Sequence, residues 1–183
     1  MTDDVKKRLN VVLVAGGKYH DIDFARLELL KLLAEDDRIR TRVYEDYSNL
    51  HAISNADFLI TYTCDVRPTL EQQKVLRDFV ANGKRWLALH GTNSILQFLS
   101  DGRVDCPRVA PIFMETLGSQ FLSHPPIEPY TVKVADHDHH LVEGVEPFET
   151  TDELYLMETH GELHVLLETE FEGKTPGFFI NAE

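Results

Sequence analysis

The sequence has few cysteines, few cations and no long apolar run, and each shortage excludes a class of protein. Its 183 residues include only two cysteines, Cys64 and Cys106. They lack metal-type spacing, which indicates neither a disulfide framework nor a zinc finger. No stretch approaches the roughly 20 apolar residues of a membrane-spanning helix, and the first ten residues lack the apolar core of a signal peptide. We therefore expect a cytoplasmic protein.

The chain has fewer positively charged than negatively charged side chains. Eighteen lysines and arginines face 31 aspartates and glutamates, for a formal net charge of −13. Nucleic-acid binding depends on clustered Lys and Arg, and anionic lipid surfaces attract the same residues, so neither partner is expected. A small molecule is the expected partner. Homo-oligomerisation is left as an alternative, because nothing in the sequence decides the oligomeric state.

The first half of the chain alternates apolar strand patterns with helical patterns. The predicted apolar face of the first helix contains Phe24, Leu27, Leu30 and Ala34, and Asp21 or Asp23 caps its start. Thr69 and Gln72 form a capping box for a later helix, which Gly83 ends. This alternation predicts right-handed crossovers and a parallel sheet of order 2-1-3-4. Its strands are expected at Leu9 to Ala15, Arg40 to Tyr44, Ala56 to Thr63 and Trp86 to Leu89.

The second half is less regular and has more strand character. Ile112 to Leu117 fits a short helix or strand, and Gly118 to Pro126 fits a turn. The later strands, two of them expected as antiparallel neighbours added to the parallel core, lie at Tyr130 to Ala135, Glu153 to Met157, Leu163 to Glu168 and Phe178 to Ile180. The composition, 43% hydrophobic and 27% charged, is globular. We predict one α/β domain over residues 1–183, with a three-layer α/β/α, flavodoxin-like architecture and a mostly parallel sheet with antiparallel additions.

Polar residues follow the predicted parallel strands. Trp86 to Leu89 has the continuous apolar pattern of a strand covered on both faces, and His90 follows it directly. Ligands of open α/β sheets bind outside the carboxyl ends of the strands. We therefore expect His90 at a cleft, although a helix-capping or core histidine is the alternative. The other strand ends add His20 and Asp21, Glu45 and Asp46, and Tyr62.

The second half contributes further candidates. His124 lies in SHPPIEP, where two prolines stiffen the loop, but a surface histidine without a role is an equal interpretation. The run DHDHH contains zinc or nickel ligand types, yet adjacent loop residues cannot all face one ion. We assign only His140 to the interior and expect His137 and His139 to be solvated. Glu153 is expected at the start of a strand. Its carboxylate is either part of the site or a structural cap.

The residue types favour acid-base or metal chemistry over nucleophilic catalysis. Histidine titrates near pH 6.5, so it exchanges protons at cellular pH, and a divalent ion such as zinc is the alternative use of the same groups. A hydrolase elbow would place Ser or Cys where His90 stands. Cys64 is expected to be a buried, inert thiol. Gly16-Gly17 lacks the third glycine of a dinucleotide loop, so we do not expect NAD.

The motifs together resemble the ThuA-like, or trehalose-utilisation, family. The resemblance rests on their order along nearly the whole chain. They are Gly16-Gly17-x-x-His20-Asp21, Glu45-Asp46, Leu70-x-x-Gln73, Phe79-Val80-x-x-Gly83, Leu89-His90-Gly91, Gly118-x-x-Phe121-x-x-His124-Pro125, Asp138 with His140 and Gly144, and Asp152-Glu153-Leu154-Tyr155.

The resemblance implies a class I glutamine-amidotransferase-like fold in which His90 replaces the cysteine elbow, so amidotransferase activity is not expected. It also implies a role in carbohydrate metabolism. Two departures from the family pattern are Leu141, where proline usually follows the histidine, and an end at Glu183. Because the chain ends there, we expect that the predicted domain lacks the family's C-terminal strands, either by truncation or by nature.

Together the residues and the resemblance predict a hydrolase or isomerase acting on a trehalose-type or keto-sugar substrate. A non-catalytic sugar-binding or regulatory module is the alternative. The predicted catalytic residues are His90 and His124, and the predicted substrate-binding residues are His20, Asp46, Tyr62, His140 and Glu153.

Overall fold

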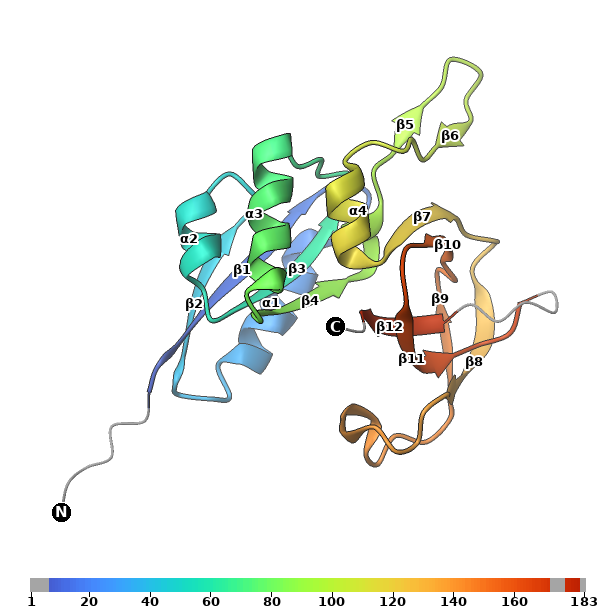
Figure 1. The fold of residues 1–183 in the computed structure, drawn as a ribbon. Helices are drawn as coiled ribbons and strands as arrows, with labels where there is room; N and C mark the ends of the chain where they lie inside the picture. Colours follow the sequence, from blue (N-terminus) through green and yellow to red (C-terminus); the bar gives the residue numbers. More distant parts are fainter. Residues whose placement is uncertain (1–6, 172–176, 182–183) are drawn as a thin grey trace. The chain divides into compact units, whose positions relative to one another are not determined.

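The chain divides into two compact units, residues 1–116 and 117–183 (Figure 1). A computed structural model describes the backbone of residues 7–171 and 177–181 and the side chains of residues 7–171. The start of the N-terminal segment, residues 1–6, where we expect no signal peptide, lies outside the described residues. The prediction of one domain stays a prediction, since compactness does not decide whether either unit folds alone.

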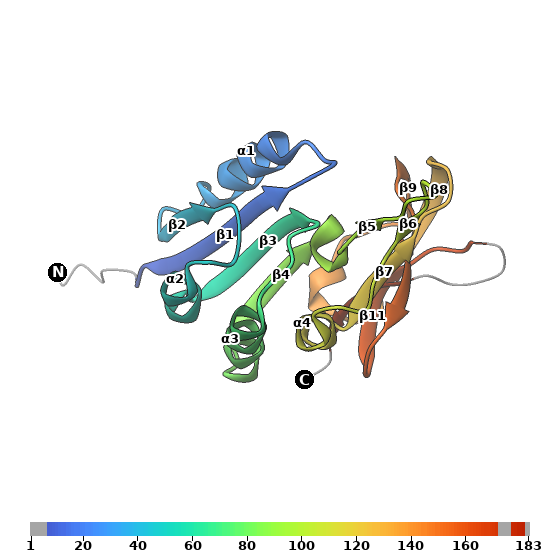
Figure 2. The ribbon, with the colours of Figure 1, turned by 90° about the horizontal axis from the view of Figure 1, so that it is seen from above.

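Unit 1, residues 1–116, is built on a parallel four-stranded sheet. The strand order is β2-β1-β3-β4, which confirms the predicted order. Helix α1 covers one face of this sheet, and helices α2 and α3 cover the other (Figure 2). The elements of the unit are β1 (Leu9–Gly17), α1 (Ile22–Leu33), β2 (Ile39–Tyr44), α2 (Leu50–Asn55), β3 (Phe58–Cys64), α3 (Leu70–Ala81), β4 (Arg85–Leu89), the 3-10 helix η1 (His90–Asn93), β5 (Gln97–Phe98), β6 (Val104–Asp105) and α4 (Pro111–Leu117).

The helices begin and end where local chemistry satisfies their unpaired backbone groups. The Asp21 carboxylate accepts a hydrogen bond from the Phe24 amide and starts α1. Thr69 and Gln72 form the predicted capping box of α3. Gly83, with a φ of +74°, follows its end as expected. No helix among the described residues is long and apolar enough to cross a membrane.

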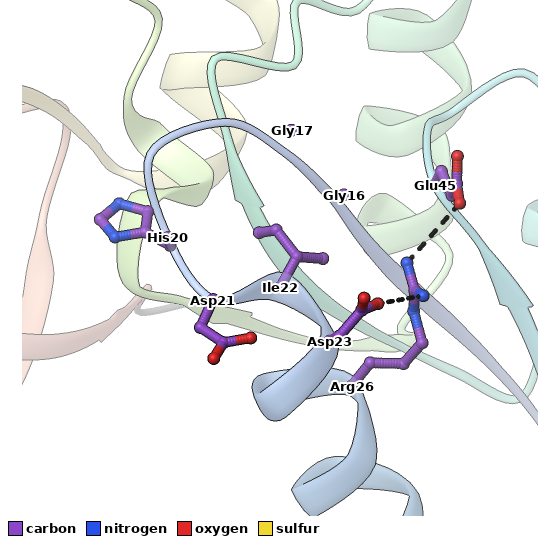
Figure 3. Close-up of a pocket in the computed structure, with 8 residues that line it drawn as sticks. All are labelled: Gly16, Gly17, His20, Asp21, Ile22, Asp23, Arg26 and Glu45. Carbon is purple, nitrogen blue, oxygen red and sulfur yellow. Dashed lines mark hydrogen bonds and ion pairs between the residues drawn. The ribbon is translucent and has the colours of Figure 1, made fainter.

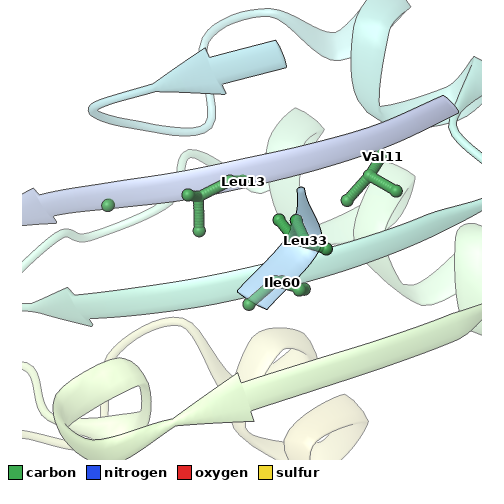
Figure 4. Packing of buried hydrophobic residues seen from close by; sticks show 5 residues of the cluster. Val11, Leu13, Leu33 and Ile60 are labelled. Atoms are coloured by element: carbon green, nitrogen blue, oxygen red, sulfur yellow. The ribbon is translucent and has the colours of Figure 1, made fainter. Parts of the chain in front are cut away.

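One core cluster of unit 1 lies between the sheet and α1. Val11 and Leu13 of β1 pack with Ile60 of β3 and Leu33 of α1 (Figure 4). The predicted apolar face of α1 is wrong in part, because Phe24 is 63% exposed and Leu27 is also exposed. Helical spacing identifies the apolar positions of a helix, but it does not determine which of them face the sheet. The buried positions of α1 are Ala25 and Leu33.

Strand β4 differs from the prediction of a strand covered on both faces. It pairs with β3 alone and ends the order of the described sheet. Trp86 packs against Phe113 of α4, with ring centroids 5.7 Å apart, while Leu87 on the opposite face is 50% exposed. A continuous apolar run indicates a hydrophobic strand, but the number of covering layers depends on tertiary neighbours.

Unit 2 contains small antiparallel sheets. The sheet order β12-β11-β8-β9 and the pair β10-β7 account for its strands, so the antiparallel additions pair with one another in sheets distinct from the parallel one. The prediction that the strands near Glu153 and Leu163 are neighbours is wrong. The turn expected before Pro126 contains a strand, while the strand near Phe178 is confirmed. The bounds are β7 (Ser119–Ser123), β8 (Glu128–Val134), the 3-10 helix η2 (His140–Val142), β9 (Phe148–Asp152), β10 (Leu156–Thr159), β11 (Leu163–Glu168) and β12 (Gly177–Asn181).

Candidate functional site

Two glycines at the end of β1 bring three strand ends together. A Cβ atom on Gly16 would lie 2.0 Å from the Glu45 carbonyl oxygen, at the end of β2. A Cβ atom on Gly17 would lie 2.0 Å from the Cys64 carbonyl oxygen, at the end of β3. Gly17 also has a φ of +110°. The glycine pair is therefore required by the close approach of the backbones at this edge.

Three non-glycine residues with positive φ follow strands at the same edge. Tyr19 (φ +70°) follows β1, Asp65 (+57°) follows β3 and His90 (+49°) follows β4. Such residues cost on the order of 1–3 kcal/mol each and cluster at functional sites. The carboxyl edge of the unit 1 sheet therefore gathers three of the four non-glycine residues with positive φ among the described residues, the fourth being Ala110.

Three of the predicted site residues meet at this edge. His90 Nε2 lies 3.3 Å from His20 Nδ1 in a hydrogen bond between the two imidazoles. The Tyr62 ring stacks on His90 with a centroid distance of 5.5 Å, and its centroid lies 6.4 Å from that of His20. The expectation that residues far apart in the sequence converge over the sheet edge is confirmed for His20, Tyr62 and His90.

Asp65 connects the loops that carry the two histidines. Its carboxylate accepts a hydrogen bond from Lys18 Nζ at 2.8 Å and another from the Leu96 amide at 3.1 Å. Its own amide donates to the Ser94 carbonyl oxygen at 2.9 Å. The side chain is only 13% exposed. The loop before His20 and the loop after His90 are thus held by one carboxylate.

A pocket of about 350 Å³ opens beside His20 (Figure 3). Such a volume is in the range of small-molecule sites. Asp46, a predicted pocket residue, lies one position beyond the lining residue Glu45. The Asp46 carboxylate accepts hydrogen bonds from Ser48, which lower its pKa. A role for Asp46 in substrate binding stays a prediction. The pocket is lined by Gly16, Gly17, His20, Asp21, Ile22, Asp23, Arg26 and Glu45.

The pocket carries one cation among several carboxylates. Arg26 donates a hydrogen bond to Asp23 Oδ1 at 2.7 Å and another to the Ala15 carbonyl oxygen at 2.9 Å. Glu45 Oε1 lies 3.8 Å from the same guanidinium. Since Arg26 is already paired, the pocket offers mainly carboxylate acceptors. That arrangement suits hydroxyl donors and disfavours an anionic ligand.

Unit 2 holds His124 beside Glu153. His124 Nε2 lies 3.7 Å from Glu153 Oε1, and Nδ1 lies 2.8 Å from the Pro125 carbonyl oxygen. A carbonyl oxygen only accepts, so Nδ1 donates in the contact with Pro125. Phe121 packs between this histidine and Tyr155, with centroid distances of 6.2 and 4.5 Å. The roles of His124 and Glu153 stay predictions.

The assignment of His140 to the interior is wrong. His140 is exposed, whereas its neighbour His139 is half-buried. His139 Nδ1 accepts a hydrogen bond from the Leu141 amide, and its ring lies 5.2 Å from His164. His164 Nε2 in turn lies 2.6 Å from Asp136 Oδ2. The capping bond orients His139 inward, which residue type alone did not indicate. A role for His140 in substrate binding stays a prediction.

The residues that support the carboxyl edge of the unit 1 sheet were not identified from the sequence. Asp65, Lys18 and Arg26 are charged residues near strand ends, and charge alone does not distinguish them from solvated neighbours. Cys64 is a buried thiol, as expected. The His20 and His90 nitrogens, 3.3 Å apart, also have the separation of about 3.3 Å expected for two ligands of a tetrahedral zinc ion.

The fold and the candidate site of unit 1 together indicate a class of protein. Unit 1 is a flavodoxin-like α/β arrangement with a histidine in a strained turn after β4, the kind of strand-to-helix turn at which α/β hydrolases place a nucleophile. A family profile described as ThuA, trehalose utilisation, matches residues 10–181. The chain belongs to this family, which confirms the resemblance.

Solved structures of ThuA-like proteins share the fold. A protein from Bacteroides uniformis ATCC 8492 is 18% identical with a TM-score of 0.69, and the match covers 90% of this chain and 69% of that one. A protein from Parabacteroides merdae ATCC 43184 is 16% identical with a TM-score of 0.60, covering 89% and 68%. No curated protein matches the chain.

Proposed function

We propose that the chain is an enzyme of carbohydrate catabolism, a hydrolase or isomerase, in which His90 and His20 exchange a proton with a bound saccharide. The observation that carries the proposal is the contact between His90 Nε2 and His20 Nδ1, 3.3 Å apart, with His90 in a left-handed conformation. Strain at a solvent-facing strand end is retained where the site requires it. Membership in a trehalose-utilisation family supports a sugar as the substrate.

The geometry of unit 1 gives each group a role. One imidazole donates the shared proton and the other accepts it, so the pair passes a proton between substrate and solvent. Tyr62 stacks on His90 and limits its rotation. The pocket beside His20 accepts sugar hydroxyls with the carboxylates of Asp21 and Glu45. General acid-base catalysis of this kind contributes on the order of 10² to 10⁴-fold in rate.

The test follows turnover of trehalose and of keto-disaccharides by NMR, with wild type, His90→Ala and the exposed-histidine control His51→Ala. We expect His51→Ala to match wild type and His90→Ala to lose at least about 100-fold in rate. Equal rates for wild type and His90→Ala would remove His90 from the mechanism. Saccharide binding that raises the melting temperature without any product would instead favour the non-catalytic binding module.

A metal-assisted version of the same site is the second candidate. It is favoured by the nitrogen separation of 3.3 Å, which suits two ligands of one zinc ion. Treatment with a chelator distinguishes the versions. The acid-base version predicts an unchanged rate after chelation. Loss of activity that added Zn²⁺ restores would establish the metal-assisted version in its place.

A further inference from the structure

Two exposed aromatic side chains stand together beside His20. Tyr19 and Phe98 are each 57% exposed, although large aromatic side chains are usually buried for most of their surface. Their ring centroids lie 5.6 Å apart with an interplanar angle of 45°. Tyr19 belongs to the loop after β1, and Phe98 belongs to β5. Both lie in unit 1, and neither belongs to its core.

A third apolar side chain extends this surface. Val104 of β6 is the register partner of Phe98 in the antiparallel pair β5-β6, so the two side chains lie on the same face of that pair. Val104 is half-exposed. We call Tyr19, Phe98 and Val104 the aromatic platform.

The aromatic platform is costly to the free protein. Tyr19 has a φ of +70°, a conformation that L residues adopt at a cost of about 1–2 kcal/mol. Its exposed ring gains little from burial in return. Three side chains are also too few for a stable protein interface, which buries about 800 Å² on each partner. Their extent suits one ring-sized ligand.

Resting on the proposed carbohydrate function, we propose that the aromatic platform binds the second ring of a disaccharide whose first ring occupies the pocket beside His20. Tyr19 directly precedes His20, which lines the pocket and contacts His90. The apolar C–H face of a pyranose ring packs on the electron-rich faces of aromatic rings. The carboxylates of the pocket accept the hydroxyls of the other ring.

The test measures dissociation constants for trehalose and for methyl α-glucoside by NMR titration, with product signals followed in the same spectra. The variants are Phe98→Ala and Tyr19→Asn, because asparagine tolerates a left-handed backbone. Phe24→Ala is the matched control, since Phe24 is an equally exposed aromatic on α1 and does not line the pocket. We expect wild type and Phe24→Ala to bind trehalose about tenfold more tightly than methyl α-glucoside.

Both platform variants are expected to lose this preference while they bind methyl α-glucoside as wild type does. A preference that persists in Phe98→Ala and Tyr19→Asn overturns the aromatic platform as a subsite and leaves the proposed function standing. Failure of wild type to bind either saccharide overturns the subsite as proposed for trehalose, and the proposed function falls with it only if the keto-disaccharides are not turned over either.

Discussion

The two units hold their predicted catalytic histidines in different ways. In unit 1, His90 follows a strand directly, has a left-handed backbone and contacts His20 at 3.3 Å. In unit 2, His124 follows β7, and its Nδ1 contacts the carbonyl oxygen of the next residue, Pro125. The unit 1 pair depends on long-range convergence at the sheet edge, whereas the hydrogen bond of His124 is made within its own loop.

This difference shows where backbone strain accompanies the positioning of a candidate site residue. The carboxyl edge of unit 1 combines close backbone contacts at Gly16 and Gly17 with positive φ at Tyr19, Asp65 and His90. Among the described residues of unit 2, positive φ occurs only at glycines. Non-glycine strain among the described residues is therefore confined to unit 1.

The largest expected effect comes from replacing the strained histidine. His90→Asn should lower the rate of saccharide turnover by about 10² to 10⁴-fold. The same change should keep or raise the free energy of unfolding, by up to about 1 kcal/mol, because asparagine tolerates the left-handed conformation. His124→Asn should bring no such gain in stability. Initial rates and urea denaturation of both variants check this, and a His90→Asn protein with wild-type activity would contradict it.

Close backbone approach in unit 1 predicts the next effect. Gly16→Ala should lower the free energy of unfolding by about 3 kcal/mol, because its Cβ would lie 2.0 Å from the Glu45 carbonyl oxygen. Gly144→Ala in unit 2 should cost only about 1 kcal/mol, for its φ of +77° in open space. Urea denaturation measures both. Equal losses would mean that the edge of the unit 1 sheet relaxes around the new methyl group.

Sequence reasoning found the parallel sheet, because strand and helix periods alternate strongly there. It also found His20, Tyr62 and His90, because strand ends of a parallel sheet share one edge. It placed Phe24 and Leu27 in the core and His140 in the interior, since residue type does not specify which side of an element faces its neighbours. It missed Asp65, whose importance depends on hydrogen bonds to Lys18 and Leu96 that only the folded backbone creates.

Asp65 offers a milder test of the unit 1 loops. Asp65→Ala should cost about 2 kcal/mol, because the partly buried Leu96 amide loses its acceptor and alanine disfavours the left-handed backbone. Asp65→Asn should cost much less, because it keeps an acceptor and loses only the ion pair with the exposed Lys18. Thermal denaturation compares the two variants. Equal losses would show that charge, and not the hydrogen bond to Leu96, holds the loops.

The smallest expected effect comes from the hydrogen-bonded pair His164 and Asp136 in unit 2. The hydrogen bond from His164 to Asp136, with a second from the Asp138 amide, lowers the pKa of the Asp136 carboxyl. A carboxyl with a lowered pKa stabilises the fold above its ordinary value of about 3.9, and that contribution is lost as the pH falls through the folded-state value. Asp136→Asn should therefore lower the melting temperature slightly at pH 7 and weaken its decrease below about pH 4. Asp138→Asn, in the same loop, should keep the wild-type pH profile, because only its backbone amide contacts Asp136. An unchanged profile in Asp136→Asn would mean that His164 and Asp136 do not pair in solution.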